Sequence, residues 1–120
     1  MFQDLRERAS GDVIDTDIAV IGAGAAGISI ARELIGSKRE VLVLESGALE
    51  AEPETLALND GTIAGEPYPP LDTTRLRFFG GTTNHWDGHC RPLDAIDFEK
   101  RSWLPYSGWP ITRDELDPFY

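Results

Sequence analysis

The chain has 120 residues, 41% of them hydrophobic, and carries a formal net charge of −10 from 21 acidic and 11 basic side chains. Its lysines and arginines form no basic cluster, which argues against a nucleic-acid partner, and no apolar run is long enough to span a membrane. Residues 1–11 are a charged leader, expected to be helical over 5–9. They lack the apolar core of a secretory signal, so we expect a cytoplasmic protein. Cys90 is the only cysteine, which excludes a disulfide within the chain.

The strongest pattern follows the leader, in residues 12–47. A short apolar run over 18–21 leads into Gly22-x-Gly24-x-x-Gly27, and a second apolar run over 41–44 ends at an acid. Between the runs, apolar residues recur at helical spacing before a stop at Gly36: Ile28, Ala31, Leu34 and Ile35. Strand, glycine turn, helix and strand in this order predict an α/β chain with a Rossmann-like βαβ unit, which holds the diphosphate of a dinucleotide.

Each glycine of the motif meets a separate steric demand. Gly22 permits the tight turn out of the strand, Gly24 leaves room for the diphosphate, and Gly27 lets the helix pack closely on the strands. The free N–H groups at the helix start then face an anion. Glu45 ends the second strand, where its carboxylate is expected to accept both hydroxyls of an adenosine ribose, which disfavours NADP.

The end of the second strand resembles the FAD-binding signature more closely than the NAD one. Flavoproteins follow the acid with a small residue and a glycine, as Glu45-Ser46-Gly47 does here. The resemblance is to the nucleotide-binding unit of FAD-dependent oxidoreductases as a class, and it implies FAD as the cofactor. An NAD-dependent dehydrogenase, for which the glycine motif alone would suffice, is the alternative among enzymes.

This βαβ unit is incomplete as a folded domain. Two parallel strands with one crossover helix cannot bury both faces of a sheet. At the other end of the chain, Thr112 with Glu115 has the form of a capping box, and Asp117-Pro118 that of a further cap. We therefore expect residues 1–120 to be the N-terminal part of an FAD-binding domain, completed by the rest of the same protein or by a second chain. A complete small domain with a frayed tail is the alternative.

Residues 48–76 are expected to leave the nucleotide-binding sheet as an excursion. Residues 53–58 predict about one helical turn with a proline near its start, stopped by Asn59-Asp60-Gly61. The prolines within 65–70 predict an extended connection, and residues 73–79 are predicted to be extended as well. No function is assigned to this segment.

The next segment, residues 77–92, is predicted to form a loop that contacts a flavin. Its run from Arg77 to Thr83, R-F-F-G-G-T-T, resembles the R-x-x-G-G-[ST]-[ST] element of the glucose–methanol–choline oxidoreductases, in which this loop lies against the flavin. Residues 93–120 begin a further region. Short runs in and near it resemble the bacterial members of that family that oxidise sugars and alcohols: Arg91-Pro92-Leu93, Ile96-Asp97-Phe98 and Ser107-Gly108-Trp109-Pro110-Ile111.

This resemblance implies oxidation of a CH–OH group of a sugar, glycoside or related alcohol. A base removes the alcohol proton and a hydride passes to the flavin. In that family the catalytic histidine lies near the C-terminus, so the catalytic residues are not assigned within residues 1–120. The electron acceptor stays open between oxygen, a quinone and a cytochrome. A non-catalytic FAD-binding or assembly module is the alternative from another class of protein.

His85 permits two interpretations. In pyranose oxidases, a histidine in a G-G-x-S-T-H-W run carries the flavin covalently, and Gly80 to Trp86 places a histidine at the matching position, although Asn84 departs from that pattern. The alternative is a histidine that packs beside Trp86 and hydrogen-bonds the flavin or the backbone. A metal site built from His85, Asp87, His89 and Cys90 is disfavoured, because neighbouring glycines and a proline oppose the helix that would align them.

The predicted cofactor-binding residues share a position in the glycine turn, at the end of the second strand or in the flavin loop. No metal ligands are predicted. The cofactor-binding set is Gly22, Gly24, Ala25, Ala26, Gly27, Glu45, Ser46, Arg77, Gly80, Gly81, Thr82, Thr83, Asn84, His85 and Trp86.

Overall fold

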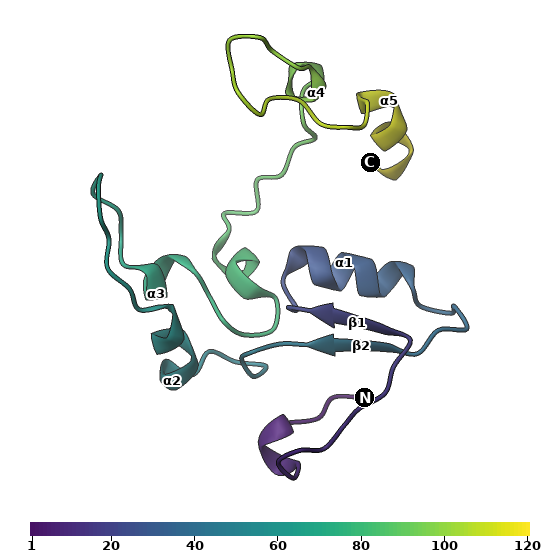
Figure 1. Ribbon diagram of the computed structural model, residues 1–120, viewed down its shortest axis with the longest axis vertical. Helices are drawn as coiled ribbons and strands as arrows, with labels where there is room; N and C mark the ends of the chain where they lie inside the picture. The colour runs from purple at the N-terminus through teal and green to yellow at the C-terminus, as the bar shows by residue number, and fades with distance from the viewer. The chain divides into compact units, whose positions relative to one another are not determined.

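All 120 residues are described in a computed structural model, and the chain divides into two compact units, Met1–Trp86 and Asp87–Tyr120. In the first unit, β1 (Ile18–Ile21) and β2 (Val41–Leu44) form a two-stranded parallel sheet. The register pairs Ile18 with Val41 and Ile21 with Leu44. Figure 1 shows α1 (Ala25–Glu33) lying along the two strands that it connects. The strand, helix and strand expected from the sequence are therefore present, within a sheet of only two strands.

Helix α1 begins where the glycine motif predicts and ends earlier than the apolar spacing predicts. The prediction included Leu34 and Ile35, but α1 ends at Glu33, and the next two amides donate to carbonyls only three residues back. This tighter last turn rotates Ile35 out to solvent, while Leu34 stays half-buried. Gly36 follows with φ of +79°, a left-handed conformation that ends helices readily when the residue is glycine.

The core of the first unit is small and lies where β1 meets the glycine turn. Val20 and Ala23 are its only buried hydrophobic residues, and all four residues of β2 are half-buried. Gly27 brings α1 close to β1, because a Cβ there would lie 1.9 Å from the carbonyl oxygen of Gly22. Ile21 is 78% exposed, as expected when one helix and two strands cannot cover both faces of a sheet.

The segment after β2 forms short helices. The predicted helical turn near Pro53 is α2 (Pro53–Leu56), which continues as the 3₁₀ helix η2 (Ala57–Asn59). The prediction of extended backbone from residue 73 is wrong at its start, because α3 (Leu71–Thr74) is helical there. The amides and hydroxyls of Thr73 and Thr74 all donate hydrogen bonds to the carbonyl oxygen of Pro70. The chain then reaches the 3₁₀ helix η3 (Gly81–His85).

The leader is attached to the segment after β2 by one arginine. It forms a 3₁₀ helix, η1 (Leu5–Glu7), that is shorter than the predicted helix over residues 5–9. Asp4 caps η1 by accepting the Arg6 amide. The Arg6 guanidinium lies 2.6 Å from Asp4 and 3.2 Å from Glu52. These ion pairs are exposed, so each contributes little to stability.

The second unit contains three short helices: α4 (Ala95–Phe98), α5 (Arg113–Leu116) and the 3₁₀ helix η4 (Asp117–Phe119). The capping box predicted from Thr112 and Glu115 is present at the start of α5, where the Thr112 amide donates to the Glu115 carboxylate at 2.7 Å. The predicted second cap is not, because the Asp117 side chain pairs with Arg113 instead. A capping box that the sequence analysis missed joins Asp94 and Asp97.

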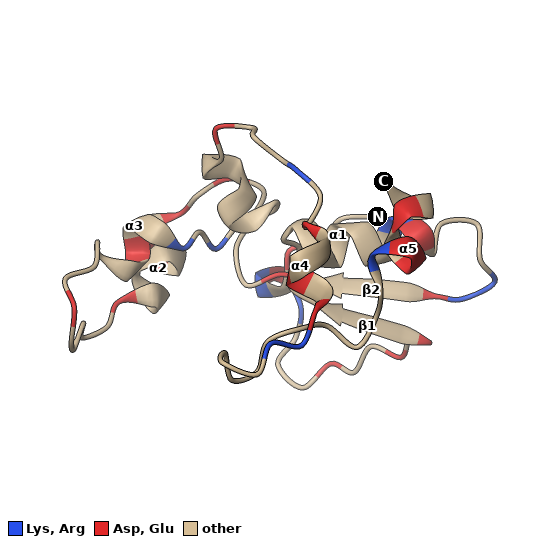
Figure 2. Ribbon diagram, turned by 90° about the horizontal axis from the view of Figure 1, so that it is seen from above, with Lys and Arg blue, Asp and Glu red and all other residues tan.

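Charged residues are spread along both units. Figure 2 shows acidic and basic residues interspersed on the ribbon, and the longest basic runs are the pairs Lys38-Arg39 and Lys100-Arg101. None of the helices has the length and apolar character needed to cross a membrane.

Candidate functional site

The glycine turn between β1 and α1 has the geometry of an anion site. Gly22 has φ of +97°, which other residues rarely adopt, and its amide donates to the Leu44 carbonyl at 2.6 Å. Gly24 caps α1 in an extended conformation without any side-chain hydrogen bond. A Cβ at Gly24 would meet no atom within 4 Å. The first-turn N–H groups of α1 therefore lack a capping side chain and have open space at Gly24, an arrangement that suits a phosphate.

A second segment, far away in sequence, pairs with this turn. The Gly80 amide donates to the Ala23 carbonyl at 2.8 Å, and Gly24 and Gly80 form an isolated parallel bridge. Gly80 and Gly81 both have positive φ, and Gly81 is buried with its missing Cβ only 3.3 Å from the Gly24 Cα. Gly81 permits this close approach because it has no Cβ facing the Gly24 Cα.

Side chains within the second segment hold its shape. The Thr83 hydroxyl donates to the Gly80 carbonyl, and the Asn84 amide nitrogen donates to the carbonyls of Phe79 and Gly81, both at 3.0 Å. The Thr82 hydroxyl accepts the Leu76 amide at 3.2 Å. These hydrogen bonds fix the conformation of the loop, which forms one wall of the site.

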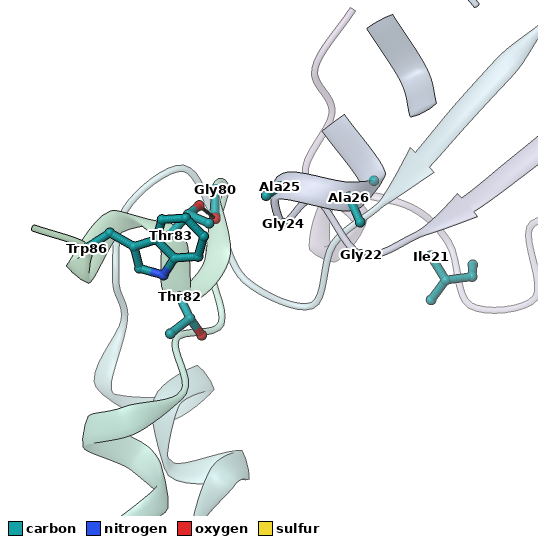
Figure 3. Close-up of a pocket in the computed structure, with 10 residues that line it drawn as sticks. Ile21, Gly22, Gly24, Ala25, Ala26, Gly80, Thr82, Thr83 and Trp86 are labelled. Carbon is teal, nitrogen blue, oxygen red and sulfur yellow. Dashed lines mark hydrogen bonds between the residues drawn. The ribbon is translucent and has the colours of Figure 1, made fainter. Parts of the chain in front are cut away.

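The turn and the loop line an open cavity of about 550 Å³. Figure 3 shows Gly80, Thr82, Thr83 and Trp86 on one side and the start of α1 on the other. Neither wall contributes a charged side chain. The lining residues are Ile21, Gly22, Gly24, Ala25, Ala26, Gly27, Gly80, Thr82, Thr83 and Trp86.

Glu45 follows β2, and its carboxylate accepts hydrogen bonds from donors of its own chain. Its Oε2 accepts the Ala23 amide at 2.7 Å, and its Oε1 accepts the amides of Ser46 and Gly47 and the Ser46 hydroxyl. Partial burial raises the pKa of Glu45, but the hydrogen bonds from Ala23, Gly47 and Ser46 lower it by more, so the net pKa is below the ordinary value. The carboxylate is therefore ionised at neutral pH.

Comparison with known proteins gives the family. A family model described as FAD dependent oxidoreductase matches residues 17–119, which is most of the chain and includes both walls of the cavity. The chain belongs to this family. FAD is accordingly its cofactor, in place of the NAD alternative, and the open, uncapped start of α1 fits the diphosphate of such a molecule.

One curated relative of this FAD dependent oxidoreductase is similar over nearly the whole chain. The 2-methyl-1,2-propanediol dehydrogenase of Mycolicibacterium austroafricanum is 29% identical to this chain over an alignment of 126 residues, gaps included, that covers 88% of the chain. The chain spans 23% of that relative's length. A comparison with solved structures finds no significant match.

Two further predicted residues link the end of β2 to the loop instead of lining the cavity. The Arg77 guanidinium donates to the Ser46 hydroxyl at 3.2 Å and to the Asn59 side-chain oxygen at 2.7 Å. Asn59 in turn donates to the Arg75 carbonyl at 2.7 Å. Arg77 and Ser46 therefore help to fix the loop to the end of β2. The hydrogen bonds of Asn59 in this connection were not predicted from the sequence.

The structure brings most of the predicted site residues together and leaves His85 at the margin. His85 is exposed on the last turn of η3 and is not among the lining residues, whereas Trp86 next to it is. No group of three or more histidine, cysteine or acidic side chains gathers as a ligand set for a metal.

Ile21 and Ala23 belong to the site but were not predicted from the sequence. Ile21 lines the cavity as the last residue of β1, and its position directly before Gly22 could have indicated this. Ala23 contributes through its backbone, since its amide binds Glu45 and its carbonyl binds Gly80. A residue that acts only through its backbone leaves no side-chain signal in a sequence.

We predict that acid loosens the turn through Glu45. Because hydrogen bonding lowers its folded-state pKa below the ordinary 4.5, its contribution to stability is complete above that value and is lost as the pH falls through the lowered pKa. NMR titration of the Glu45 carboxyl should show the low pKa, and the Ala23 amide should lose protection from hydrogen exchange over the same pH range. Glu45→Gln is the control, in which the Ala23 protection should be reduced at every pH. If the protection of the Ala23 amide did not change while Glu45 became protonated, this assignment would be wrong.

Proposed function

We propose that the chain binds FAD in the cavity between the glycine turn and the loop from Arg77 to Trp86, within an oxidoreductase that oxidises a CH–OH group. The observation that carries the proposal is the pairing of Gly80 with Ala23 and Gly24, which joins two separate sequence motifs into one cavity. The similar dehydrogenase supports an alcohol as the substrate, because its name gives a diol.

In this proposal the turn binds the diphosphate and Glu45 the adenosine ribose. The diphosphate lies against the first-turn amides of α1, beside the open space at Gly24. Glu45 Oε2 has one hydrogen-bond partner in its own chain, the Ala23 amide, so it retains acceptor capacity for a ribose hydroxyl. Its low pKa favours the ionised state that such hydroxyl donors require.

The loop from Gly80 to Trp86 is proposed as the wall that the isoalloxazine ring approaches. Its two glycines leave the backbone open, and Trp86 presents an aromatic surface to the cavity. An experimental structure with FAD tests this directly. A ring more than about 5 Å from every atom of residues 80–86, beyond ordinary packing contact, would refute the assignment.

We further propose the glucose–methanol–choline type within the broader family, on the strength of the Arg77 to Thr83 run. Bound FAD would accept the hydride of the alcohol, and this chain's residues would hold and orient it. The base that takes the alcohol proton is proposed to lie outside residues 1–120. The substrate is a small sugar, glycoside or related alcohol, and the acceptor of the electrons is left open.

The rest of the fold is proposed to come from the remainder of the same protein or from a second chain. The support is the exposed Ile21 on a two-stranded sheet, and the relative of which this chain spans 23%. The division into residues 12–47, 48–76, 77–92 and 93–120 stays part of the proposal. A cytoplasmic location does too.

The function is tested with the intact protein that contains this chain. We expect a flavin absorption band near 450 nm, roughly as in other flavoproteins, that bleaches under anaerobic conditions on addition of an alcohol substrate. A panel of vicinal diols, sugars and glycosides should identify the class of substrate, with amines and 2-hydroxy acids as controls. A protein without flavin would contradict FAD binding. A flavin that amines bleach and alcohols do not would contradict the CH–OH assignment alone.

We predict that Gly24→Val abolishes FAD binding while the fold is kept. Gly24 has an extended conformation that valine adopts easily, and a Cβ at this position, which lines the cavity, would meet no protein atom within 4 Å. Losing glycine as the helix cap should cost about 1 kcal/mol. FAD content and the free energy of unfolding are measured together. Ser29→Val is the control, because it puts the same side chain on an exposed position of α1. A Gly24→Val protein that still binds FAD would place the diphosphate elsewhere.

We predict that FAD is held without a covalent bond. His85 is exposed and does not line the cavity, so its imidazole is not positioned on the cofactor side of the loop. Precipitating the native protein with acid should release the yellow colour into the supernatant. A yellow pellet that becomes colourless in His85→Ala would establish the covalent link instead.

A further inference from the structure

We propose that Gly47 is a positioning residue for the FAD cavity, and that its missing side chain is what lets the loop from Arg77 to Trp86 rest against the glycine turn. This inference rests on the proposed FAD site. Gly47 itself does not line the cavity and needs no contact with the cofactor.

The evidence begins with the space around Gly47. A Cβ at this position would lie 2.0 Å from the Arg77 carbonyl oxygen, 2.5 Å from its carbon and 2.8 Å from the Phe78 Cα. All three are backbone atoms, so no flexible side chain can move aside. Gly47 is not among the glycines with positive φ, so alanine could adopt its conformation. The demand for glycine is therefore purely spatial, and it comes from the crossing of the loop over the end of β2.

Two hydrogen bonds lead from this crossing to the cavity. The Phe79 amide donates to the Ala48 carbonyl at 2.9 Å, directly after Gly47 in the chain. The next amide, that of Gly80, donates to the Ala23 carbonyl at 2.8 Å. The end of β2 and the glycine turn thus bind consecutive residues of the loop, and the position of one bond constrains the other.

A Cβ at Gly47 would need the Arg77 backbone to retreat by more than about 1 Å to reach ordinary contact distance. Because Arg77 is only two residues from Phe79, this displacement reaches both amides. It moves the wall that carries Thr82, Thr83 and Trp86 away from Gly24. If FAD must move the loop back into place, part of the binding free energy is used for that rearrangement and the affinity falls.

The test compares Gly47→Ala with Gly61→Ala in the intact protein. Gly61 is a matched control, because a Cβ there would meet only the end of the Leu71 side chain at 3.3 Å and the Asn59 carbonyl at 4.0 Å. In Gly47→Ala we expect the dissociation constant for FAD to rise at least about tenfold, the effect of a lost preorganised wall. The amides of Phe79 and Gly80 should exchange hydrogen faster, while the amides of β1 and β2 keep their protection. Gly61→Ala should match the wild type in both measurements.

A second measurement keeps the proposal testable if Gly47→Ala fails to fold. In wild-type protein stripped of FAD, the amides of Phe79 and Gly80 should stay protected, since the chain itself and not the cofactor holds the loop. Free exchange of these amides without FAD would overturn the proposal. So would a Gly47→Ala protein with wild-type affinity, or one that loses affinity while both amides stay protected. A wild-type protein that never binds FAD would instead refute the proposed function, and the exchange measurements would still judge Gly47.

Discussion

The structure depends on one close approach between backbones, at Gly24 and Gly80. The two residues form a parallel bridge between segments that lie more than fifty positions apart in the chain, and the buried Gly81 packs next to them. A Cβ on Gly81 would lie 3.3 Å from the Gly24 Cα, so a larger residue at that position would push the segments apart. Without the approach, the glycine turn would be an open helix start, and the loop after Arg77 would have no fixed place. The cavity forms because backbone contacts, not side-chain packing, hold the glycine turn and the loop together.

Glycines in this chain serve separate demands, which their surroundings distinguish. Gly22 is required by its backbone conformation, with φ of +97° and free space where a Cβ would be. Gly27 and Gly47 are required by neighbouring backbone atoms, which a Cβ would approach to 1.9 Å and 2.0 Å. Gly24 has neither an unusual conformation nor a neighbour in the way. Packing within the chain therefore does not require glycine at this position, whereas the proposed diphosphate would.

Local patterns were predicted from the sequence where a residue's own preference decides the structure. Both strands have the predicted bounds, because short apolar runs beside the glycine motif leave few alternatives. The end of α1 and the helix at Leu71–Thr74 were predicted wrongly, because single hydrogen-bond choices decide them, such as the attraction of two threonines to the Pro70 carbonyl. The pairing of Gly80 with the turn is a contact between distant segments, and only a family resemblance suggested that the loop belongs to the site. The donors to Glu45 are mostly backbone amides, which have no signature in a sequence.

The electrostatics of the cavity explain how a chain with a net charge of −10 can hold an anionic cofactor. No lysine or arginine of residues 1–120 lines the cavity, so within this chain the proposed attraction to a diphosphate rests on the uncapped N–H groups and dipole of α1. The nearby negative charge of Glu45 would oppose this, but four donors from Ala23, Ser46 and Gly47 already offset it. The Ala23 amide that binds Glu45 also fixes the turn, so the same hydrogen bond orients the groups that face the phosphate. The acid can therefore lie near the proposed anion site because donors of the chain partly offset its charge.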